Sequence, residues 1–103
     1  MVNWNEEVLA RRNQLVEDLF GLLRIESVKD LSTSTKEQPM GEKVGEALDY
    51  VLRLSEELGL DTKNVDGYAG HGQLGQNEDA ETIGILCHVD VVPASGEWTS
   101  PPF

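Results

Sequence analysis

The sequence is poor in residues that would place it in several common classes of protein. It has one cysteine, Cys87, which excludes an internal disulfide and any need for an oxidising compartment. Only 8 residues are Lys or Arg against 19 Asp or Glu, so the formal net charge is -11. A chain this acidic lacks the basic surface that neutralises phosphates, so we expect no nucleic-acid partner.

Long apolar runs are also missing. No stretch approaches the roughly 18 apolar residues of a membrane helix, and residues 1–7 are acidic, unlike the start of a secretory signal. We therefore expect no signal sequence, no membrane partner and a soluble cytoplasmic protein. The apolar content still suffices for folding, because Leu, Ile, Val and Phe make up 28 of 103 residues, above the roughly 20% typical of disordered chains.

Hydrophobic periodicity predicts two helices followed by three strands. The helices are expected over about 5–24, capped by Asn3 or Asn5, and over about 41–58, with Gly59 just past the end. A polar loop over 27–40 separates them. The strands are expected over 60–65, over 68–74 after an Asp66-Gly67 turn, and over 82–87, an apolar run typical of a strand buried on both faces. The order helix-helix-strand-strand-strand predicts an α/β fold with a mixed sheet flanked by helices.

One segment combines a buried strand with residues capable of chemistry. The predicted strand 82–87 leads directly into His88, and Asp90 follows two residues later. Since strand side chains alternate with period two, His88 and Asp90 should project from the same side. A neutral imidazole is a common zinc ligand whose orientation is usually fixed by a carboxylate or carbonyl. From the residues alone, a metal site and a purely structural histidine–carboxylate hydrogen bond both stay open.

Three other features have simpler interpretations. Cys87 could pair with His88 as a nucleophile, but adjacent strand residues point to opposite faces, which favours a small buried side chain. His71 could be a second ligand, but a solvent-facing histidine is the simpler expectation. Residues 70–75 match G-x-G-x-x-G, yet they fall inside a predicted hairpin rather than between a strand and a helix, so no phosphate loop is expected.

The segment from His88 to Phe103 resembles a motif of zinc exopeptidases. It resembles H-x-D-V-V-P-x-G-x-x-W-x-x-x-P-F, found in the family that includes aminoacylases, carnosinases, bacterial dipeptidases, and acetylornithine and succinyl-diaminopimelate deacylases. The short turn differs locally, because Ser95 stands at the position of the motif's glycine and Gly96 follows it, but Trp98 stays in register. Further stretches resemble the peptidase V-type dipeptidases in particular, so that the similarity covers nearly the whole chain. These stretches are Trp4, Leu22-Leu23-Arg24-Ile25-Glu26-Ser27-Val28, Pro39-Met40-Gly41 and Asn64-Val65-Asp66-Gly67-Tyr68-Ala69-Gly70.

This resemblance implies a role for two residues. His88 corresponds to the family's first zinc-ligand histidine, and Asp90 to the acidic residue that supports the site and is counted as catalytic. In members of the family, the other ligands and the general base come later in the sequence than this motif. We therefore expect residues 1–103 to be the N-terminal portion of a larger catalytic domain, inactive by itself. Any lid or dimerisation domain would then lie outside it.

The resemblance therefore predicts a zinc metallopeptidase with two zinc ions in the intact enzyme, hydrolysing small peptides by metal-activated water. Other divalent metals could replace zinc, and the oligomeric state is left open. Two alternatives are kept: an N-acyl amino acid amidohydrolase or deacylase of the same family, and a non-catalytic acidic interaction module.

Overall fold

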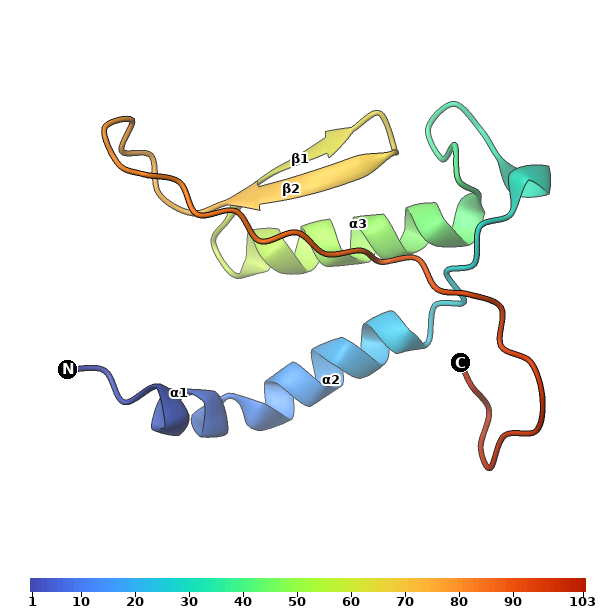
Figure 1. The fold of residues 1–103 in the computed structure, drawn as a ribbon, viewed down its shortest axis with the longest axis horizontal. Helices are drawn as coiled ribbons and strands as arrows, with labels where there is room; N and C mark the ends of the chain where they lie inside the picture. Colours follow the sequence, from blue (N-terminus) through green and yellow to red (C-terminus); the bar gives the residue numbers. More distant parts are fainter.

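A computed structural model describes all 103 residues as three α-helices, one short 3₁₀ helix and a two-stranded antiparallel sheet. The elements are α1 (Trp4–Ala10), α2 (Arg12–Leu23), η1 (Leu31–Thr33), α3 (Glu42–Glu57), β1 (Asp61–Val65) and β2 (Ala69–Gln73). The hairpin lies over α3, with α2 on the other side of that helix (Figure 1). The predicted mixed helix-and-strand class is confirmed. None of the helices is both long enough and apolar enough to cross a membrane.

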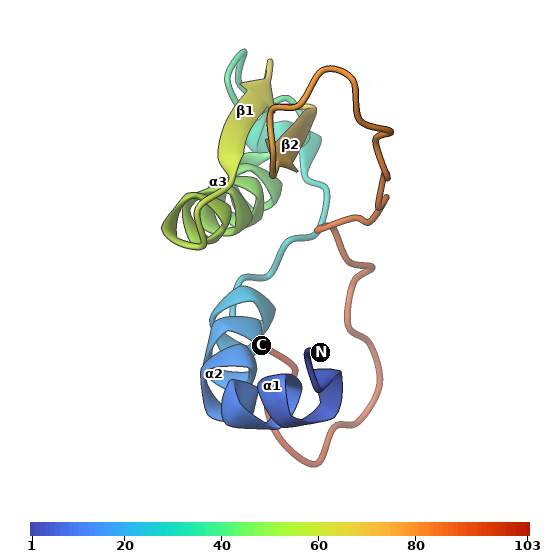
Figure 2. The ribbon, with the colours of Figure 1, turned by 90° about the vertical axis from the view of Figure 1, so that its left-hand side faces the viewer.

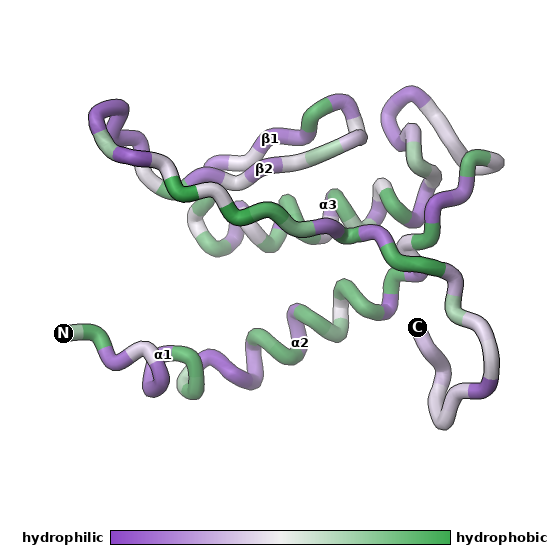
Figure 3. Tube along the Cα trace, in the orientation of Figure 1, coloured by the Kyte–Doolittle hydropathy of each residue, from purple (hydrophilic) through white to green (hydrophobic).

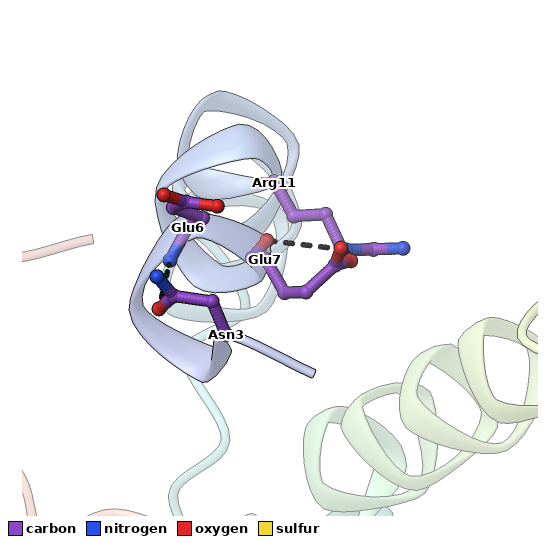
Figure 4. Close-up of polar contacts among 4 residues, drawn as sticks. All are labelled: Asn3, Glu6, Glu7 and Arg11. Atoms are coloured by element: carbon purple, nitrogen blue, oxygen red, sulfur yellow. Dashed lines mark hydrogen bonds and ion pairs between the residues drawn. The ribbon is translucent and has the colours of Figure 1, made fainter. Parts of the chain in front are cut away.

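The first predicted helix is interrupted at Arg11. Asn3 caps α1, as predicted, by accepting a hydrogen bond on Oδ1 from the Glu6 N–H at 3.4 Å. The guanidinium of Arg11 pairs with the Glu7 carboxylate and also donates to the Glu7 carbonyl at 3.1 Å (Figure 4). No proline or glycine marks this break in the sequence, and the exposed apolar side chains of α1 have no packing partner that would hold a straight helix.

Helix α3 forms as predicted and carries the small core of the chain. Its buried residues are Val44, Gly45 and Ala47, and Gly59 follows the helix with φ of 92°. The Tyr50 hydroxyl donates to the Asp18 carbonyl at 2.7 Å and so ties α3 to α2. Helix α3 thus joins the hairpin on one side to α2 on the other (Figure 2).

The glycines of the hairpin have structural roles. Asp66 and Gly67 both have positive φ, as a type I′ turn requires, and the Tyr68 N–H donates to the Val65 carbonyl at 3.1 Å. A Cβ on Gly70 would lie 2.8 Å from Leu52 of α3, and one on Gly72 would lie 2.9 Å from Leu60. Close packing of β2 on α3 explains Gly70, and close packing on the turn between α3 and β1 explains Gly72. The G-x-G-x-x-G string lies in and just after β2, as predicted, and precedes no helix.

The prediction of a third strand over 82–87 is wrong for this structure. Only β1 and β2 form a sheet, and residues 82–87 run extended without pairing (Figure 1). Their apolar side chains face solvent: Ile83 and Ile85 are each 90% exposed and Leu86 is fully exposed. Figure 3 shows this hydrophobic stretch in the extended segment beyond β2. A strand needs a neighbour for its backbone groups, and no neighbouring strand is present here.

The prediction of a buried Cys87 is wrong for the same reason. Its thiol is exposed, because the segment that carries it has no covering layer. His71, by contrast, is exposed on β2 opposite Lys63, in agreement with the simpler expectation for that residue.

Candidate metal-ligand site

The segment around His88 is anchored to the loop that follows α2. The Ser27 carbonyl accepts a hydrogen bond from the Val91 N–H at 3.0 Å, and the Ser27 hydroxyl donates to the Val89 carbonyl at 2.8 Å. Val28 and Val91 form an isolated parallel β-bridge. Residues 89–91 are therefore extended because they pair with residues 27 and 28, more than sixty positions earlier.

His88 and Asp90 lie together, as the spacing predicts. The His88 Nδ1 atom is 3.2 Å from the Asp90 carboxylate oxygen and 2.9 Å from the Asp90 carbonyl oxygen. A proton on Nδ1 would serve either oxygen, which leaves the lone pair on Nε2 free. The His88 side chain is 81% exposed and that of Asp90 61%, so this pair lies at the surface of the chain.

The pair has the arrangement of one zinc ligand and its supporting residue. A neutral imidazole with one nitrogen held by a carboxylate or carbonyl is the usual arrangement of a zinc-bound histidine. Zinc sites need at least three protein ligands, and the structure contains no group of three or more His, Cys, Asp or Glu side chains that could hold a metal ion. His71 and Cys87 therefore do not complete the site, and Cys87 makes no hydrogen bond to His88.

A groove in the surface lies away from this pair. A groove of about 570 Å³ runs along α3 and β1, with polar side chains from Glu42 to Asn64 on its walls. Neither His88 nor Asp90 lines it. The Glu46 carboxylate on α3 accepts a hydrogen bond from the Lys43 ammonium group and raises its pKa. Lys43 lies on α3 and is not part of the His88–Asp90 pair.

Sequence reasoning did not identify Ser27. This residue is 2% exposed and supplies both hydrogen bonds that hold residues 89–91. A serine in a loop carries no local pattern that marks such a contact. Its only signal was its place within one of the stretches that resemble the dipeptidases.

No protein-family model matches the chain, but individual relatives do. A protein of Staphylococcus epidermidis is 50% identical over 97% of the chain, one of Bacillus subtilis 46% over 99%, and one of Staphylococcus haemolyticus 44% over 97%. All three bear the name putative dipeptidase.

The expected resemblance to dipeptidases is confirmed by these names, and the matched region extends over nearly the whole chain. The chain spans only about a fifth of the length of these relatives, 21–22% of each.

Proposed function

We propose that the intact protein carrying this chain is a zinc-dependent dipeptidase of the di-zinc exopeptidase family, and that residues 1–103 form the N-terminal part of its catalytic domain. The observation that carries the proposal is the His88–Asp90 pair, with Nδ1 facing Asp90 and Nε2 free. The names of the relatives supply the substrate class, a small peptide. A cytoplasmic location is part of the proposal and is supported by the single cysteine.

Each residue of the pair has a distinct task in this proposal. His88 would hold zinc through Nε2, and Asp90 would fix the imidazole tautomer and raise its basicity through Nδ1. Bound zinc supplies a water of lowered pKa and polarises the scissile carbonyl. The remaining ligands and the general base would come from other parts of the intact protein, so this chain alone should hydrolyse no peptide.

Substitution of the two residues in the intact protein should have different effects on metal and on turnover. We expect His88→Ala to lower zinc occupancy and abolish dipeptide hydrolysis, because a ligand is lost. Asp90→Asn keeps the shape but removes the charge, so it should retain much of the zinc, with affinity lowered about 10–100-fold, and lose most activity. The measurements are zinc per protein molecule and hydrolysis of a dipeptide panel.

His71→Ala is the matched control, because His71 is an exposed histidine outside the pair. It should leave both zinc content and activity unchanged. Full zinc and full activity in His88→Ala would show that the site assignment is wrong. Hydrolysis of N-acetyl amino acids in preference to dipeptides would favour the deacylase alternative, and absence of both activities would favour the non-catalytic module.

A further inference from the structure

Ser27 contacts the candidate site from a distant part of the chain. It follows Ile25 and Glu26 after α2 and is the most buried polar residue of the structure, at 2% exposure. Its hydroxyl donates to the carbonyl of Val89, the residue between His88 and Asp90, at 2.8 Å. Its own carbonyl accepts from the N–H of Val91, the residue just after Asp90, at 3.0 Å.

These two hydrogen bonds fix the peptide groups on both sides of Asp90. The orientation of the Val89 carbonyl and of the Val91 N–H determines where the Asp90 backbone lies. The Asp90 carbonyl in turn lies 2.9 Å from His88 Nδ1, and its carboxylate lies 3.2 Å from the same atom. The direction of the imidazole therefore depends on backbone that Ser27 holds.

The contact between Ser27 and Val89 is polar and specific rather than a filling of the core. Val89 is only partly buried, so water can replace the hydroxyl at its carbonyl if Ser27 is changed. Loss of the hydroxyl should then loosen residues 88–91 without unfolding α3, whose buried residues Val44 and Ala47 belong to another part of the chain.

We propose that Ser27 is a positioning residue for the His88–Asp90 pair, acting through the backbone of residues 89–91. This inference rests on the proposed zinc-dependent function. Within that function, Ser27 contacts neither metal nor substrate. It holds the histidine and its supporting carboxylate in the orientation that a metal ligand requires.

The test compares Ser27→Ala, Ser27→Thr and Ser55→Ala in the intact protein. Thr keeps the hydroxyl, and Ser55 is the matched control because its hydroxyl donates at the same distance, 2.8 Å, to a carbonyl within α3. The two readouts are amide hydrogen exchange of residues 88–92 and zinc affinity by competition with a chelator. Exchange of residues 44–54 in α3 reports whether each variant is folded.

We expect Ser27→Ala to speed exchange at residues 88–92 and to weaken zinc binding. The loss of zinc affinity should be about tenfold, the lower end of the effect of removing a residue that supports a metal ligand. Ser27→Thr should restore most of both values, and Ser55→Ala should change neither. Exchange in α3 should stay at the wild-type rate in all three variants.

Three results would overturn the inference, and they are distinguishable. Unchanged exchange and zinc affinity in Ser27→Ala, with a zinc-binding wild type, would reject the role of Ser27 alone. Faster exchange in α3 as well would make Ser27 a residue needed for folding rather than for positioning. A wild type that binds no zinc would reject the proposed function and, with it, the metal-positioning role, whatever the exchange rates.

Discussion

At the scale of single residues, the His88–Asp90 pair shows how much its surroundings matter. Both side chains are mostly exposed, so water competes for their polar atoms, and even an exposed pair of full charges contributes only about 0–1 kcal/mol to stability. The pair therefore cannot hold its own geometry. The two hydrogen bonds between Ser27 and the adjoining backbone do so, one donated by its hydroxyl and one accepted by its carbonyl, and they make the orientation of His88 depend on residues near α2.

Cys87 gives a prediction at the same scale. Because the thiol is exposed in this chain, it should react with a maleimide stoichiometrically and without denaturant. The rate should lie within a few-fold of the rate measured for the same chain in urea. Labelling that becomes complete only after urea is added would contradict the exposed position and restore the buried one that the apolar run predicts.

At the scale of elements, glycines decide how closely helices and strands approach. The hairpin packs on α3 because Gly70 leaves room for Leu52 of that helix, and Gly72 leaves room for Leu60 in the turn between α3 and β1. Gly21 has the same role between α2 and α3, since a Cβ there would clash with the Tyr50 hydroxyl group. A glycine inside a helix costs about 1 kcal/mol relative to alanine, and the contact with Tyr50 explains why α2 has one.

Gly21→Ala should therefore destabilise the chain despite the higher helix propensity of alanine. Displacing Tyr50 costs its hydrogen bond to Asp18 and strains the packing, and after the propensity gain we expect a net loss of about 1 kcal/mol in the free energy of unfolding. The free energy of unfolding is measured by urea denaturation monitored with circular dichroism.

Two variants serve as controls for Gly21→Ala. Tyr50→Phe removes the hydrogen bond without the clash and should cost about 1 kcal/mol or less. Gly84→Ala should be neutral, because no atom lies within 4 Å of the added Cβ. A Gly21→Ala chain more stable than wild type would mean that α2 and α3 do not pack through Tyr50.

At the scale of the whole molecule, the chain is too open for a closed domain of its size. Its radius of gyration is 16.3 Å, against about 13 Å for a compact chain of roughly 100 residues. Its accessible surface is 8882 Å², against about 5,800 Å² expected for a folded monomer of 11.4 kDa. Only 6 of 103 residues are buried, so much of the apolar surface has no cover within the chain.

We expect the isolated chain to self-associate through this uncovered surface. The most exposed apolar stretch is residues 83–86, an unpaired extended segment of the kind that aggregates through edge pairing. Ile85→Glu should reduce association more than Leu58→Glu, which makes the same charge change at a solitary exposed leucine past α3. Sedimentation at several concentrations measures this, and a sharp, concentration-independent melt of a monomer would contradict it.

Local chemistry in the sequence determined the elements that close within a short stretch of chain. Helix α3 with Gly59 after it, the Asn3 cap and the Asp66-Gly67 hairpin all rest on contacts a few residues apart, and periodicity and turn residues predicted them. The spacing of His88 and Asp90 likewise predicted that the two would lie together, because side chains two apart on an extended segment share a face.

Only the tertiary structure decided the features that depend on distant partners. The run 82–87 has the composition of a buried strand, but pairing and burial are properties of a neighbour, and without one the segment and Cys87 lie in solvent. No local pattern predicts three further features either: the break at Arg11, the contact of Gly21 with Tyr50, and the hydrogen bonding of Ser27 to residues 89–91. Each arises from contacts, or from missing contacts, with residues that the local sequence does not contain.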